Sequence, residues 1–159
     1  MEFPKRIYTS EEVARAKELI AKGYRHRITI KGSPRFRHKV KRALSLVKTA
    51  GYSDYLRTYI RRIEEVDGLT QLRNADASIW TNKYAVENSV DAASMFVQKA
   101  SVMKEYVELI HYYSGQAEKR SVQKRIEFLM SLKDKSREEK VIAECNRLLQ
   151  FWRESSLAY

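Results

Sequence analysis

The spacing of apolar residues predicts a mostly helical chain with a few short strands. Apolar positions recur every three or four residues over about 10–23, 33–51, 53–65, 89–114, 117–132 and 136–152, which predicts helices. Alternation in Arg25–Lys31 predicts a strand, and the segments LTQL, ASIWT and YAVEN predict others, the last two joined by a hairpin turn at Asn82-Lys83. We therefore expect an α+β fold, mostly helical with about five helices, and a small antiparallel or mixed sheet.

Capping signals mark where several of these helices begin. Thr9 and Glu12 have the spacing of a capping box, in which each side chain accepts a hydrogen bond from the other residue's backbone. Ser33 followed by Pro34 places a capping residue before a proline at the first helical position. The segment 89–114 is apolar on almost every side and is followed by a glycine, so we expect a central helix that stops there.

Positive charge is concentrated in one segment of the chain. The sequence has 31 Lys and Arg against 20 Asp and Glu, a formal net charge of +11. Ten of the basic residues, and no acidic one, lie between Leu19 and Ser53, while the remainder is nearly balanced. A localised cationic surface attracts polyanions, so nucleic acid, an anionic membrane surface and an acidic protein are the natural partners.

The predicted strand and helix within this segment define a candidate binding surface. Three of its cations lie on the outer face of the strand and the others along the two flanks of the helix. The candidate nucleic-acid-binding residues are Arg25, Arg27, Lys31, Arg35, Arg37, Lys39, Lys41 and Arg42. Tyr24 or Phe36 would be available for base stacking if exposed. Because no zinc finger, RRM or KH signature is present, we expect contacts to the backbone and no reading of base sequence.

Two other readings of the basic segment stay open. It could be a solvated face, or it could meet an acidic patch on a partner or on a second copy of the chain. Ten tyrosines and two tryptophans, several of them near HYYSG and the C-terminus, would suit the interface of a homo-oligomer.

Length and apolar content predict one domain spanning 1–159. No run of eighteen uncharged apolar residues occurs, and the first residues do not resemble a signal peptide, so we expect a soluble, cytoplasmic protein without a transmembrane segment. Cys145 is the only cysteine, which excludes an internal disulfide, and its place in a helical pattern predicts a small buried residue.

The residue types needed for catalysis are scarce. The chain has three histidines, His26, His38 and His111, and no two are spaced by three or four residues on one helix. No glycine-rich phosphate loop or nucleophile elbow is present. We therefore expect a protein without catalytic activity, bound metal or cofactor.

The order of elements resembles a family of small zincin-like predicted metallopeptidases. The resemblance covers roughly 28–132 and is carried by ITIKGSPRF, KVKRALSLV, YSDYLRTYIRRI, ASIWTNKYAVENS and the long apolar helix after them. In that family the long helix carries a His-Glu-x-x-His motif that holds zinc. Here the motif falls on Lys99–Met103, KASVM, or, shifted, on Lys104–Glu108, KEYVE, which restores one Glu but no His, so the resemblance implies a degenerate member without the zinc-binding histidines.

The same resemblance gives Lys99 a role. Lys99 is the only charged residue between Ala92 and Met103, so its ammonium must either reach solvent or meet an acidic partner. As a relic of the metal site, Lys99 would take the place of the metal and pair with Glu118, which resembles the position of a third ligand, or with another carboxylate on the neighbouring helix. The alternative function is then an inactive zincin-like scaffold for protein interaction or assembly.

Overall fold

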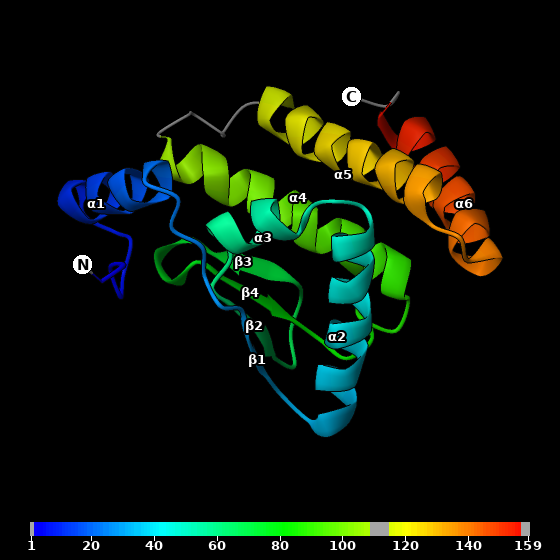
Figure 1. Ribbon diagram of the computed structural model, residues 1–159, viewed down its shortest axis with the longest axis horizontal. Coiled ribbons are helices and arrows are strands. Elements are labelled where there is room, and N and C mark those ends of the chain that lie inside the picture. The colour runs from blue at the N-terminus through cyan, green and yellow to red at the C-terminus, as the bar shows by residue number, and fades with distance from the viewer. Residues whose placement is uncertain (1, 109–114, 157–159) are drawn as a thin grey trace.

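The computed structural model describes residues 2–108 and 115–156. Its elements follow the order (Figure 1) α1 Ser10–Ala21, β1 Thr29–Lys31, α2 Pro34–Thr49, α3 Ser53–Tyr59, β2 Arg62–Glu65, β3 Gln71–Arg73, a one-turn 3₁₀ helix Asn74–Asp76, β4 Ser78–Thr81, α4 Ser89–Val107, α5 Gly115–Lys135 and α6 Glu139–Ser156. The predicted fold class is confirmed: the chain is α+β, mostly helical, with a small mixed sheet.

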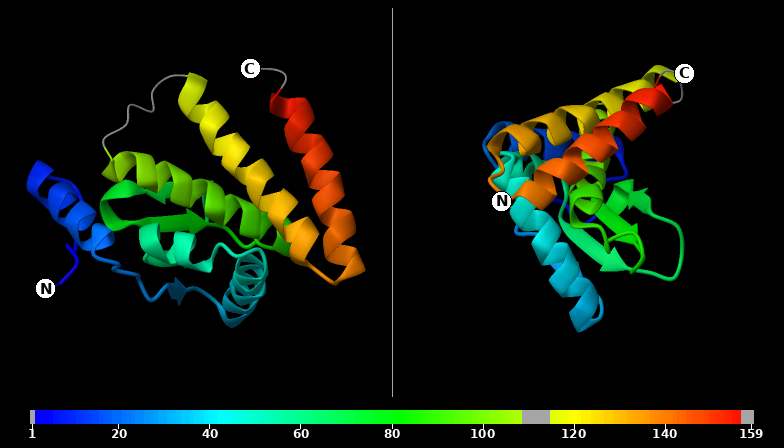
Figure 2. Two further views of the ribbon diagram at one scale, coloured as in Figure 1. Left: turned by 45° about the horizontal axis from the view of Figure 1, so that its top comes forward. Right: turned by 90° about the vertical axis from the view of Figure 1, so that its right-hand side faces the viewer.

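The sheet has four strands in the order β1-β2-β4-β3. β1, β2 and β4 run parallel, and β3 is antiparallel to β4 at one edge. The register aligns Ile30, Ile63, Ile79 and Leu72 in one row, so these side chains share one face of the sheet. Ile63 and Ile79 are fully buried in that row, and the helices gather on one side of the sheet (Figure 2).

Helix α4 is the centre of the core, as its apolar pattern predicts. Ten of its residues are buried, including Phe96, Val97 and Ala100, because α4 packs against α1, α2, α3, α5 and α6. Helices α5 and α6 run side by side as a hairpin against α4 (Figure 2). The Asn88 side chain caps α4 by accepting a hydrogen bond from the Asp91 backbone N–H.

The two predicted N-terminal caps are confirmed. Thr9 and Glu12 form the capping box of α1, with both reciprocal hydrogen bonds present. The Ser33 hydroxyl accepts from the Phe36 backbone N–H at the start of α2, and Pro34 occupies the first turn. These bonds satisfy backbone donors that the helix itself leaves unpaired.

Three sequence predictions are wrong. The helix over 53–65 ends at Tyr59, because 62–65 is held as a strand between two parallel neighbours, and this pairing overrides the helical spacing. YAVEN is not a strand: the antiparallel partner of β4 is β3, and the Asn82 side chain instead accepts from the N–H groups of Tyr84 and Ala85 in a turn. The third wrong prediction concerns Gly115, which was expected to stop the central helix but belongs to α5. The predicted helix end at 109–114 and most of HYYSG lie outside the described residues.

The predicted strand at Arg25–Lys31 is present in part. Only Thr29–Lys31 joins the sheet, whereas the His26 backbone N–H donates to the Arg57 carbonyl at 2.7 Å and so attaches this segment to α3. Among the described helices, none is both long and apolar enough to cross a bilayer.

Candidate functional site

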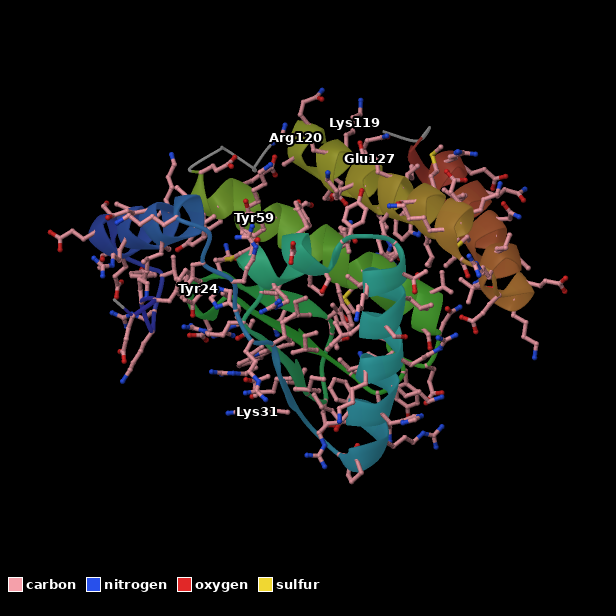
Figure 3. The ribbon with its side chains drawn as sticks, viewed as in Figure 1. Tyr24, Lys31, Tyr59, Lys119, Arg120 and Glu127 are labelled. Atoms are coloured by element: carbon pink, nitrogen blue, oxygen red, sulfur yellow. The ribbon has the colours of Figure 1, made fainter. Side chains whose placement is uncertain are left out.

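The eight predicted basic residues lie on β1, on the extended segment before it and on α2. All are exposed except Lys39, which is half-buried. Figure 3 shows Lys31 reaching from β1 away from α2. The helical spacing predicts two flanks of cations on α2, and the structure shows that one flank is paired with acidic residues and the other has no such partners among the described residues.

One flank of α2 is neutralised by carboxylates from distant parts of the chain. Arg35 and Lys39 both pair with Glu87, at 3.1 Å and 3.6 Å. Arg42 pairs with Glu138 at 3.0 Å, and its guanidinium also reaches the second carboxylate oxygen at 3.2 Å. These contacts tie α2 to the segment before α4 and to the connection between α5 and α6.

The other flank of α2 has exposed cations without carboxylate partners. Arg37, Lys41 and Lys48 make no ion pair or side-chain hydrogen bond within residues 2–108 and 115–156, and the same holds for Arg27 and Lys31. We call these five residues, Arg27, Lys31, Arg37, Lys41 and Lys48, the unpaired basic flank.

A shallow pocket shows that this flank of α2 faces the strand side. Leu44 lies in the same helical stripe as Lys41 and Lys48 and lines a pocket of about 210 Å³ together with Arg27 and Ile28. Arg27 therefore lies beside the helical stripe that carries Lys41 and Lys48. Lys48, which is absent from the eight candidates, joins this surface because it continues the stripe by one turn.

The predicted stacking residues are not exposed aromatic platforms. Phe36 is 1% exposed and belongs to the core, so the expectation that it could stack on a base is wrong. The Tyr24 ring is half-buried and stacks on Phe3 with centroids 4.9 Å apart (Figure 3 labels Tyr24). Tyr84, which the sequence pattern places in a strand, has instead an exposed ring, with 76% of the residue accessible. It lines a pocket of about 280 Å³ together with Arg35.

The three residues predicted as relics of a metal site have different environments. Lys99 is half-buried beside a pocket, Met103 is 1% exposed in the core, and Glu118 is exposed in the first turn of α5. No ion pair joins Lys99 to Glu118 in the described part of the chain, so the predicted pairing is wrong. Burial and the nearby Arg125 guanidinium lower the pKa of Lys99, while the charge of Glu118 opposes this shift.

A polar network surrounds Arg125 next to Lys99. Arg125 is 6% exposed and donates to the Asp91 carboxylate at 2.6 Å and to the Gln98 side-chain oxygen at 2.7 Å. The Gln98 amide nitrogen in turn donates to the Ser121 hydroxyl at 3.2 Å. The Trp152 ring lies over the guanidinium, with 4.3 Å from Cζ to the ring centroid. Sequence analysis missed this network because its members come from α4, α5 and α6.

His26 and Cys145 lie in surroundings that favour their uncharged forms. His26 is buried, and burial first and Arg61 second lower its pKa to about 4. Burial and the neighbouring Glu144 raise the pKa of Cys145 to about 11, so its thiol stays protonated at neutral pH. Within the described ranges, no three His, Cys, Asp or Glu side chains gather as metal ligands would; His111 lies outside them.

Comparison of the chain with known protein families, with curated proteins and with solved structures finds no match in any of the three. The zincin-like resemblance therefore stays a prediction from element order.

Proposed function

We propose that this protein binds the phosphate backbone of nucleic acid through the unpaired basic flank, without a catalytic step. The observation that carries the proposal is the division of α2: one flank has its cations paired with Glu87 and Glu138, whereas the other has none paired among the described residues. Unpaired cations have no carboxylate to release before they contact a phosphate. The proposal therefore assigns binding to all five residues of the unpaired basic flank, on α2 and on the strand segment.

The dimensions of the flank suit a short stretch of backbone. Arg37 and Lys48 are eleven residues apart in α2, which corresponds to a rise of about 16 Å. One strand of a duplex carries a phosphate about every 3.4 Å along the axis, so this length matches about five phosphates. Because the exposed unpaired side chains are Lys and Arg, which contact phosphates, binding should depend on salt and little on base sequence.

Two matched triple variants test the proposal. The first is Arg37→Gln, Lys41→Gln and Lys48→Gln on the unpaired flank. The control, Arg35→Gln, Lys39→Gln and Arg42→Gln, removes the same charge from the same helix. Affinity for labelled duplex DNA, single-stranded DNA and RNA is measured by fluorescence anisotropy over a series of salt concentrations.

We expect the unpaired-flank variant to bind at least about tenfold more weakly at physiological salt. Its plot of log affinity against log salt should be less steep by almost 3, since each duplex phosphate contact contributes about 0.9 to the slope. The control variant should change affinity by less than about threefold. Equal loss in both variants would mean that only net charge matters, and absence of binding by the natural protein would redirect the search to acidic protein partners or to self-association.

A further inference from the structure

A pocket of about 440 Å³ opens between the three helices that follow the sheet. Its walls come from α4, α5 and α6, from Thr70 just before β3 and from Ala85 after β4. The lining combines two cations, one carboxylate and apolar surface: Thr70, Ala85, Asp91, Met95, Gln98, Lys99, Arg125, Phe151 and Trp152.

Three acceptors in this pocket are already in use. The Asp91 carboxylate accepts from Arg125 Nη2 at 2.6 Å, and the Gln98 side-chain oxygen accepts from Arg125 Nη1 at 2.7 Å. The Thr70 hydroxyl is hydrogen-bonded to the Thr81 hydroxyl at 2.6 Å. A ligand entering the pocket therefore finds few unused acceptors.

Donors, in contrast, remain unused. Arg125 Nε and Trp152 Nε1 are buried and have no hydrogen-bond partner among the described residues. The Arg125 side chain as a whole is 7% exposed. The Lys99 ammonium has neither a hydrogen bond nor an ion pair within the described ranges. Because a buried donor without an acceptor is costly, a ligand that supplies oxygen acceptors would be favoured here.

Charge specifies the ligand further. Lys99 and Arg125 contribute two positive charges and Asp91 one negative charge, so the lining carries a net charge of about +1. Met95, Phe151 and the Trp152 ring supply apolar area next to these groups, and Phe151 is 53% exposed. A single carboxylate attached to a flat apolar body matches both the charge and the surface.

We infer that this pocket binds a small organic carboxylate, with the carboxylate paired to Lys99 and the apolar body packed against Met95, Phe151 and Trp152. This inference is independent of the proposed nucleic-acid binding, because none of its residues belongs to the unpaired basic flank.

The test uses the two tryptophan indole N–H signals in a ¹H–¹⁵N spectrum of the full chain. Trp152 lines the pocket, whereas Trp80 lies on β4 with its ring against the Arg73 guanidinium, 4.2 Å from Cζ to the centroid, and serves as the internal control. Benzoate is titrated first, followed by benzamide, benzylamine and phenyl phosphate at the same concentrations.

Benzoate should shift the Trp152 signal in a saturable manner and leave Trp80 unmoved. Neutral benzamide and cationic benzylamine should bind at least about tenfold more weakly, because they lack the charge that pairs with Lys99. An equal response to benzamide, or no response to benzoate, would overturn the inference. Phenyl phosphate binding as tightly as benzoate would overturn the assignment to a carboxylate.

A pair of lysine variants locates the charge. Lys99→Met should weaken benzoate binding at least about tenfold, whereas Lys104→Met, a control on the same helix outside the pocket lining, should leave it unchanged. The spectrum itself reports whether each variant is folded. Benzoate binding unaffected by Lys99→Met in a folded variant would refute the assigned role of Lys99.

Discussion

Acid should destabilise this protein through His26. The ring is 2% exposed and packs edge-on against Phe3 at 4.5 Å and Tyr24 at 5.0 Å between centroids. Its Nε2 atom is buried without a hydrogen-bond partner. Burial, with a smaller contribution from the positive charge of Arg61, lowers the pKa of His26 from 6.5 to about 4, because the apolar site and the neighbouring cation both disfavour the imidazolium.

The direction of the pH effect follows from this shift. Well above pH 6.5 His26 is neutral in both the folded and the unfolded chain, and the full stability is present. As the pH falls from 6.5 towards 4, the unfolded chain takes up a proton that the folded chain excludes, so the free energy of unfolding falls. Between about pH 7.5 and about pH 4.5 the loss attributable to His26 is about 2.5 kcal/mol.

Urea denaturation followed by circular dichroism measures this loss at the two pH values. In His26→Phe, which keeps a ring between Phe3 and Tyr24, we expect the acid-induced loss to shrink by about 2 kcal/mol relative to the natural protein. His38→Gln, an exposed site on α2, is the control and should retain the loss. An equal acid-induced loss in the His26→Phe variant, or an NMR titration of His26 with its midpoint near 6.5, would refute the reasoning.

Three further stability changes follow from the structure. Asp91→Asn should lower the free energy of unfolding by about 2–4 kcal/mol, because it leaves the buried Arg125 guanidinium without its carboxylate, whereas Arg125→Met should cost less, because the Asp91 side chain that it leaves is 37% exposed; the double variant should cost less than the sum by about 1–3 kcal/mol, and additive urea-denaturation values would contradict the coupling. Lys99→Met should raise the melting temperature and change stability by more than roughly 0.5 kcal/mol, since it removes a desolvated charge beside Arg125, and a thermally silent substitution would contradict this. Gly32→Ala should lower stability by about 1–3 kcal/mol, because an added Cβ would lie 2.7 Å from Phe36 Cδ1; an unchanged melting temperature would show that the Phe36 ring can move aside.

The fold class was predictable because its main signals are local or periodic. The capping box of α1 and the Ser33-Pro34 start of α2 act within three or four residues, and the all-round apolar pattern of 89–107 requires burial whatever surrounds it. The errors at 62–65 and 84–88 arose where short segments satisfy more than one period. Strand partners from elsewhere in the chain decided the conformation of 62–65, and hydrogen bonds to the Asn82 side chain formed a turn at the start of 84–88.

The candidate sites were predictable only in part. Concentration of positive charge near β1 and α2 is a property of composition, so the sequence located the basic surface. It did not reveal which cations are paired, because Glu87 and Glu138 lie 52 and 96 residues from Arg35 and Arg42. Nor did it reveal the pocket around Arg125.

By itself, the sequence determined the helical content, the helix starts and the concentration of charge, since each depends on neighbours along the chain. Tertiary structure alone decided that Arg62–Glu65 is a strand, that one flank of α2 is neutralised and that Lys99, Arg125 and Trp152 line one pocket. The physical reason is range: caps and periodic burial act over a few residues, whereas strand pairing, ion pairing and desolvation depend on segments that only folding brings together.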